Sequence, residues 1–129
     1  MVSAEKITPE KIEAVVHRYL ELVAGGSADD IADLFADDAT VEDPVGGGEV
    51  HIGRSAIHGF FKNVESAQRT TELKALRVAG HEAAFMFVIT VDAGGHKVAI
   101  EPIDVMNFNA DGKITSMKAY WSFADAKQL

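Results

Sequence analysis

Apolar side chains in the first half of the chain recur with the spacing of α-helices. Thr8 and Pro9 are residue types typical of a helix start, and Gly25 is typical of a helix end. Between them, the apolar stripe has members three or four residues apart: Ile12, Val15, Val16, Tyr19, Leu20 and Val23. A shorter stripe follows Ser27, and a third begins at Ser55. The pattern therefore predicts three N-terminal helices.

The second half of the chain changes to patterns that are typical of β-strands. Four stretches are rich in β-branched, aromatic or alternating residues: 70–78, 82–91, 97–108 and 113–122. Turn-forming runs separate the last three stretches, at 93–95 and 109–112. A shorter extended stretch, 39–43, precedes the third helix. Helices that come before consecutive hairpins predict the α+β class, with a curved antiparallel sheet packed on three N-terminal helices.

The stretch 82–91 is apolar on both of its faces. The two alternating sets are Phe85, Phe87, Ile89 and Val91 on one face and Ala84, Met86 and Val88 on the other. We therefore expect this strand to lie in the centre of the sheet. A curved sheet wrapped against helices forms a cone with an apolar interior, which suits a small-molecule ligand.

Three polar side chains interrupt these apolar patterns. Asp43 shares its face of the first extended stretch with Ala39 and Val41. Asp104 lies in an apolar row of the stretch 97–108, and Tyr19 lies on the buried stripe of the first helix. These faces offer no lysine or arginine to pair with the two carboxylates. Two acids and one phenol are therefore expected in the interior.

Burial without a cation raises the pKa of a carboxyl group. We expect Asp43, next to Pro44 and a glycine-rich loop, to stay largely ionised near the mouth of the interior. Asp104, in the middle of its strand, is better placed to remain protonated and to donate a hydrogen bond beside Tyr19. An anionic base opposite two donors suits proton abstraction next to a carbonyl group, through an enolate. The alternative is structural: each Asp caps a turn or pairs with a base, and the Tyr19 hydroxyl bonds to a backbone carbonyl.

Composition narrows the classes of partner. Hydrophobic residues make up 47% of the 129 residues, which is enough for one packed domain spanning 1–129. With 12 basic and 20 acidic residues, the formal charge of −8 argues against nucleic-acid and membrane partners. The absence of cysteine excludes disulfides, thiolate metal sites and a cysteine nucleophile. Residues 1–6 contain no apolar run typical of a signal peptide, so we expect a cytoplasmic protein.

Four segments of the chain resemble bacterial ketosteroid isomerases (steroid Δ5-isomerases), and they occur in the same order as in that family. They are HRYLELV at 17–23, DDATVEDPVG at 37–46, PIDVMNF at 102–108 and KITSMKAYWS at 113–122. The resemblance spans nearly the whole chain, and the run DDATVEDP is specific. It implies the cone-shaped fold of the nuclear-transport-factor-2-like superfamily and a homodimer.

The resemblance also implies a role for each polar residue. Asp43, the acid of VEDP, is the general base that moves a proton from C4 to C6 of a 3-oxo-Δ5-steroid, while Tyr19 and Asp104 hold the dienolate oxygen at C3. No cofactor and no metal are implied. Some members carry a tyrosine that hydrogen-bonds the catalytic tyrosine, and this chain has Phe61 there. The implied substrate-contacting positions are Phe61, Met86, Phe87, Asp104 and Trp121. Core packing is the alternative for Met86, Phe87 and Trp121, and it explains Met86 at least as well.

Two other kinds of function share this fold and this type of interior. A polyketide cyclase or an epoxide hydrolase also uses buried acids, but Asp104 paired with Tyr19 favours the isomerase. A non-catalytic carrier would bind steroids or other flat apolar ligands, but it would have no use for the base Asp43. The five histidines lack an accompanying carboxylate–histidine cluster at ligand spacing, so no metal site is predicted.

Overall fold

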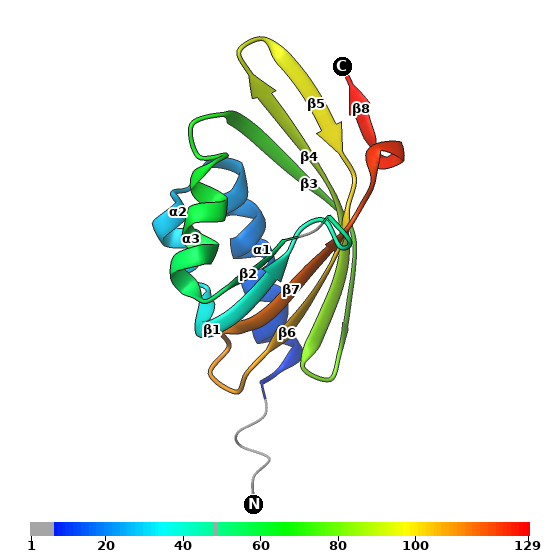
Figure 1. The fold of residues 1–129 in the computed structure, drawn as a ribbon. Coiled ribbons are helices and arrows are strands. Elements are labelled where there is room, and N and C mark those ends of the chain that lie inside the picture. Colours follow the sequence, from blue (N-terminus) through cyan, green and yellow to red (C-terminus); the bar gives the residue numbers. More distant parts are fainter. Residues whose placement is uncertain (1–6, 48) are drawn as a thin grey trace, which may run out of the picture.

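The computed structural model describes residues 7–47 and 49–129; residues 1–6, where no signal peptide is expected, lie outside them. Three α-helices of the described chain pack on one face of a curved sheet (Figure 1). The helices are α1 (Pro9–Gly25), α2 (Ala28–Ala32) and α3 (Arg54–Lys62). The predicted α+β class is confirmed, and the third helix begins one residue earlier than expected. No helix among the described residues is long and apolar enough to cross a membrane.

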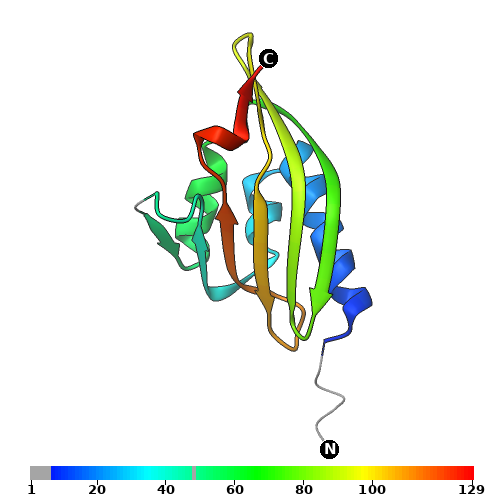
Figure 2. The same ribbon diagram turned by 90° about the vertical axis from the view of Figure 1, so that its right-hand side faces the viewer.

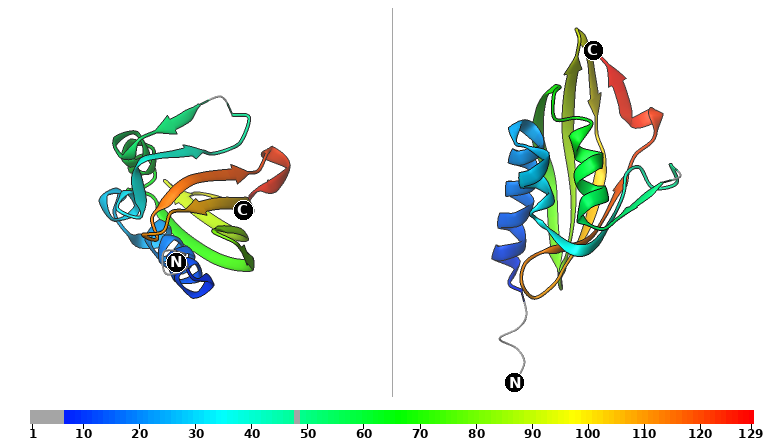
Figure 3. Two further views of the ribbon diagram at one scale, coloured as in Figure 1. Left: turned by 90° about the horizontal axis from the view of Figure 1, so that it is seen from below. Right: turned by 60° about the vertical axis from the view of Figure 1, so that its left-hand side comes forward.

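Eight strands form the sheet, which bends around the helices and carries none of them on its outer face in the described chain (Figures 2 and 3). Their order is β2-β1-β7-β6-β4-β5-β8, with β3 paired to β4. The strands are β1 (Phe35–Glu42), β2 (Val50–Ile52), β3 (Gln68–Ala79), β4 (Glu82–Ala93), β5 (His96–Ile100), β6 (Ile103–Phe108), β7 (Ile114–Tyr120) and β8 (Ala126–Gln128). As predicted, β4 is central, since it pairs with β3, β5 and β6.

Helix α1 begins and ends as its sequence predicts. The Thr8 hydroxyl accepts a hydrogen bond from the Lys11 amide at 3.1 Å, which caps the first turn. After Gly25, the amide of Gly26 donates to the Leu22 carbonyl at 2.6 Å. The buried stripe faces the sheet and consists of Ile12, Val15, Val16, Tyr19, Leu20, Leu22 and Val23. Burial of this stripe fixes α1 on the inner face of the sheet.

Two features of the sheet differ from the prediction. The expected strand 97–108 is split into β5 and β6, because Pro102 has no amide hydrogen to donate to a neighbouring strand. In addition, β1 pairs with β7 in parallel, with Val41 opposite Met117. The other strand pairs described are antiparallel. Parallel pairing is possible here because a long stretch of chain connects β1 to β7, whereas a tight hairpin joins only antiparallel strands.

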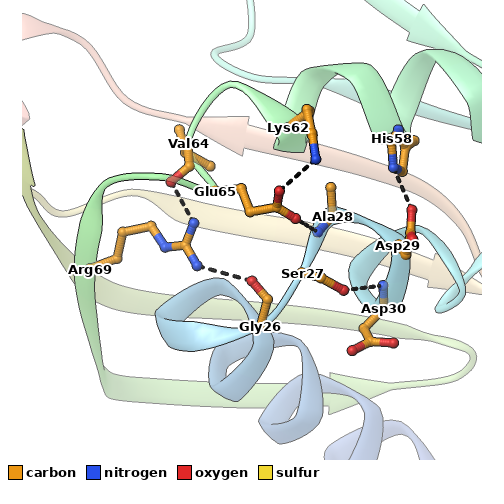
Figure 4. A network of polar contacts seen from close by, with 10 residues as sticks. All are labelled: Gly26, Ser27, Ala28, Asp29, Asp30, His58, Lys62, Val64, Glu65 and Arg69. Atoms are coloured by element: carbon orange, nitrogen blue, oxygen red, sulfur yellow. Dashed lines mark hydrogen bonds and ion pairs between the residues drawn. The ribbon is translucent and has the colours of Figure 1, made fainter.

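A network of polar contacts ties the helices to β3 (Figure 4). Arg69 of β3 is only 8% exposed, and its guanidinium donates to the carbonyl groups of Val64 and Gly26. The carboxylate of Glu65 accepts from the Ala28 amide at 2.7 Å, at the start of α2. The network therefore joins the end of α1, the start of α2 and the connection from α3 to β3. It thereby sets the position of α3 over the sheet.

Candidate active site

Asp104 lies on the inner face of β6 and is 1% exposed. Its cross-strand neighbours are Phe85 of β4 and Ala119 of β7, both buried. The Oδ1 atom has no hydrogen-bond partner among the described residues. Burial, and secondarily the negative charge of Asp43, raises the pKa of Asp104 well above its usual value. These surroundings favour a neutral carboxylic acid with an O–H group available to a ligand.

Tyr19 of α1 lies over the same part of the sheet and is 2% exposed. Its ring contacts Phe61 and Phe85 edge to face, with centroids 6.1 and 6.3 Å away. Phe85 is also the cross-strand neighbour of Asp104, so the phenol and the acid share one apolar surrounding. Burial first, and then the charges of Asp104 and Asp43, raise the pKa of Tyr19 well above 10. The phenol is therefore a neutral hydrogen-bond donor.

Asp43 follows directly after β1 and is half-buried. The indole Nε1 of Trp121 donates to its Oδ1 at 2.8 Å. The loop that follows is attached to β7, because the Val45 amide donates to the Ala119 carbonyl at 2.8 Å. Ala119 lies opposite Asp104 in the sheet register. These contacts place the Asp43 carboxylate at the end of β7, on the side of the sheet where Asp104 lies.

The two acids differ in their electrostatic surroundings. For Asp43, burial raises the pKa, while the Trp121 hydrogen bond and the charge of His51 lower it. For Asp104, no such opposing influence is found among the described residues. The anion is therefore much better supported at Asp43 than at Asp104. The negative charge of Asp43 also raises the pKa values of Asp104 and Tyr19, as expected for groups that share one interior.

Three of the predicted substrate-contacting side chains accompany this cluster. Phe61 of α3 is 4% exposed and touches the ring of Tyr19. Phe87 is 3% exposed on the inner face of β4. Trp121 holds Asp43, a contact that the sequence did not predict.

The prediction that Met86 contacts the substrate is corrected by the structure. It alternates with the buried Phe85 and Phe87, so its side chain lies on the outer face of β4, opposite Ile103 of β6. Because side chains alternate along a strand, Met86 and Phe87 do not both point inward. The alternation that placed Asp104 correctly, applied to this pair, would have excluded Met86 from the sequence alone.

The histidines are dispersed over the molecule. His51 of β2 packs on Phe60 of α3, with ring centroids 4.7 Å apart. His58 pairs with Asp29 at 2.6 Å on the helical side. Within residues 7–47 and 49–129, no three His, Asp or Glu side chains are grouped so that they would hold a metal ion. His51 is the histidine whose charge reaches Asp43, and no sequence pattern singled it out.

Comparison with protein families and curated sequences gives two matches. The family model described as a SnoaL-like domain matches residues 16–117. A curated protein from Nocardioides simplex, named steroid Delta-isomerase, is 54% identical over 116 residues, which are 89% of this chain and 93% of that protein. The family model begins within α1 and ends within β7, so the matched region contains Tyr19, Asp43 and Asp104.

Two solved structures with a similar fold cover nearly the whole chain. The epoxide hydrolase/cyclase-like enzyme SalBIII, described for pyran ring formation in the polyether salinomycin, superposes with a TM-score of 0.85 and 30% identity. The alignment covers 93% of this chain and 97% of SalBIII. RV0760c from Mycobacterium tuberculosis has a TM-score of 0.87 at 21% identity, covering 96% and 100% of the two chains. The second likeness concerns the fold alone.

Proposed function

Since this chain belongs to the family of SnoaL-like domains, with the nuclear-transport-factor-2-like fold, we propose that it is a steroid Δ5-isomerase. It converts 3-oxo-Δ5-steroids into the conjugated 3-oxo-Δ4-steroids. The observation that carries the proposal is the 54% identity to a steroid Delta-isomerase over 89% of the chain. The cluster of Asp43, Tyr19 and Asp104 supplies a chemical basis for this activity.

Asp43 acts as the general base in this proposal. Its carboxylate takes the proton from C4 of the substrate, and the electron pair moves into a dienolate with negative charge on the oxygen at C3. The same carboxyl group then returns the proton to C6, so no proton is gained or lost overall. The Trp121 N–H holds Oδ1 at 2.8 Å, which leaves Oδ2 as the atom that reaches the substrate.

Tyr19 and Asp104 stabilise the dienolate. Both groups are buried, burial favours the neutral form of each, and the neutral form offers an O–H donor in apolar surroundings. Hydrogen bonds from such donors strengthen as charge grows on the C3 oxygen, because the interior lacks competing water. Oδ1 of Asp104 is buried and has no hydrogen-bond partner in the described chain, so it is free to interact with a bound ligand. The reaction needs a base and two donors, and it calls for no cofactor or metal.

The likeness to SalBIII favours a second candidate, an epoxide-opening or cyclising enzyme on the same scaffold. That reaction also uses buried acids. At 30% identity, this likeness is weaker than the 54% match, and we place it second. A steroid carrier is the non-catalytic alternative, and binding without turnover would identify it.

The first test is turnover of 5-androstene-3,17-dione, followed by the ultraviolet absorbance of the conjugated enone. The purified protein is expected to produce the enone catalytically. Tight steroid binding without any absorbance change would point to a carrier. Hydrolysis of an epoxide in a parallel assay, with no enone formed, would favour the second candidate.

The second test is Asp43→Asn, which removes the base and retains its size. We expect kcat to fall by about 10²–10⁴-fold, the usual contribution of a general base. Binding of a phenolic steroid, which contacts the two donors, should be retained. Asp38→Asn, an exposed position on the same strand, is the matched control. Wild-type turnover by Asp43→Asn would refute the assignment of the base.

The substrate class and the assembly complete the proposal. The substrate is a small-molecule 3-oxo steroid, with no nucleic-acid or membrane partner, and the cysteine-free chain works in the cytoplasm. We place a second copy of the chain on the outer face of the sheet. Support comes from Met86, Ile103 and Tyr120, which are cross-strand neighbours there, and the last two are 41% and 46% exposed.

A further inference from the structure

His51 lies on the same face of the sheet as the proposed base. In the antiparallel β1–β2 pair it stands directly opposite Val41, which is fully buried on the inner face. Asp43 follows two residues after Val41, so His51 and Asp43 are diagonal neighbours on that face. Cβ atoms in such diagonal positions lie roughly 7 Å apart, within reach of an imidazole and a carboxylate.

The packing around His51 holds its ring near this position. The ring is half-buried and stacks on Phe60 of α3, with centroids 4.7 Å apart and planes inclined by 39°. Phe60 carries no charge, so nothing from α3 competes with Asp43 for an imidazolium. The neighbouring Glu42 belongs to the opposite set of β1 side chains, and its carboxylate accepts from the Gly46 amide at 3.2 Å.

The other groups that face Asp43 do not supply a cation. Trp121 of β7 donates a neutral N–H bond. Tyr19 of α1 and Asp104 of β6 interact with Asp43 electrostatically, and both disfavour negative charge when they are themselves ionised. A positive charge on His51 lowers the pKa of Asp43. An imidazolium at this point opposes the burial that would otherwise protonate the base.

We propose that His51 is a positioning residue for catalysis, whose imidazolium keeps the carboxylate of Asp43 ionised at mildly acidic pH. This inference rests on the proposed function, because it assigns Asp43 the role of base. Histidine side chains generally gain their proton between pH 8 and pH 5. A cation next to a half-buried carboxylate opposes the protonation that burial favours. The result is an enzyme that remains active further into the acidic range.

The direction in which loss of His51 shifts the pKa of Asp43 follows from the charge of the imidazolium. His51 lowers the pKa of Asp43, so its loss raises that pKa, and the base is protonated at a higher pH. In His51→Gln, the acidic limb of the kcat/KM profile should move upward by about 0.5 pH units, which is about threefold in rate on the acidic side. On the alkaline side of the profile, where Asp43 is ionised in both proteins, kcat/KM should change little.

Two further variants separate charge from shape. His51→Lys retains a cation and should return the acidic limb to the wild-type position or below it. His96→Gln removes an exposed histidine at the start of β5 and should leave the limb unchanged. A limb that stays in place in His51→Gln, or that moves equally in His51→Lys and His51→Gln, would overturn the proposal.

A direct titration makes the test independent of turnover. The side-chain carboxyl of Asp43, assigned by comparison with Asp43→Asn, is followed by ¹³C NMR against pH in the wild-type protein and in His51→Gln. An upward shift in the variant supports the inference even if no steroid is turned over, in which case the proposed function alone has failed. Identical titration curves would refute it even in an active isomerase.

Discussion

Asp43 and Asp104 are the same residue type in two different surroundings. Asp104 is the second residue of β6, not in the middle of a strand as expected, yet it is only 1% exposed, and its Oδ1 finds no partner within the described chain. Asp43 lies past the end of its strand, where an indole N–H and a histidine charge favour the anion. One interior thus supports a base and a proton donor at the same pH. Phe61 contributes contact area to Tyr19 but no hydroxyl, so the phenol has no hydrogen bond from this side.

Asp104 makes stability depend on pH. Its pKa is raised in the folded protein, so between about pH 4 and that raised pKa, the unfolded chain ionises while the native protein stays neutral. The wild type therefore loses free energy of unfolding as the pH rises, by about 1.4 kcal/mol for each such pH unit. Asp104→Asn removes this loss, so its stability relative to the wild type should increase as the pH rises above about 4.

Urea unfolding at several pH values measures this difference. Asp111→Asn, in an exposed turn, serves as the control and should show no growing gain. The same Asp104→Asn variant should turn over steroid more slowly, because a weaker donor faces the dienolate. A stability difference that is constant with pH would show that Asp104 is not held neutral.

At the level of elements, Arg69 is a buried cation whose recorded partners are backbone carbonyls, those of Val64 and Gly26. These bonds join three segments that the sequence separates: the end of α1, the turn after α3 and strand β3. Glu65 adds to the same network by accepting a hydrogen bond from the Ala28 amide. The network keeps α3 in place, and therefore also Phe60 and Phe61, which contact His51 and Tyr19 respectively.

Arg69→Met retains most of the apolar stem and removes the donors. We expect the free energy of unfolding to fall by about 2–4 kcal/mol, because hydrogen bonds to charged groups contribute about 1.5–3 kcal/mol each. Arg77→Met on the exposed side of the same strand is the control and should change it by less than about 0.5 kcal/mol. Urea unfolding of the two variants measures both changes in the free energy of unfolding. A neutral effect of Arg69→Met would mean that burying the charge costs as much as its bonds return.

How far the sequence predicts these elements depends on the range of the interaction. The inward positions of Asp43 and Asp104 follow from alternation along a single strand, which is local. The contact of Trp121 with Asp43 joins residues 78 apart and depends on the parallel β1–β7 pairing. No local pattern indicates which strands become neighbours, and for the same reason His51 was not singled out. Their roles in catalysis stay predictions until the variants are measured.

For the whole molecule, the two faces of the sheet differ. The inner face meets the helices, whereas no helix of the described chain covers the outer face (Figure 2). By the strand register, Met86, Ile103 and Tyr120 are neighbours across three strands on this outer face. Ile103 and Tyr120 are opposite each other at 41% and 46% exposure. An exposed apolar patch of this kind is typical of a protein–protein interface. It is the surface through which the proposed homodimer would form.

Tyr120→Glu introduces a charge into this patch, next to Ile103. If the patch is the dimer interface, the variant should dissociate at concentrations at which the wild type is dimeric, with an affinity loss of at least about tenfold, or 1.4 kcal/mol. Light scattering after size-exclusion chromatography measures the mass. Ile52→Glu, an exposed apolar residue on the edge strand β2, is the control and should stay dimeric. A dimer that tolerates Tyr120→Glu would place the interface elsewhere.

The parallel contact between β1 and β7 has a consequence for biosynthesis. A ribosome releases the N-terminal segments first, so the three helices and Asp43 emerge long before Trp121 and its strand exist. Until those final residues arrive, one long side of β1 has no neighbour to pair with. A nascent chain halted before residue 114 therefore carries Tyr19, Asp43 and Asp104 but lacks Trp121, whose N–H binds Asp43. If these three groups act as proposed, enzymatic competence is acquired only with the closing stretch of translation.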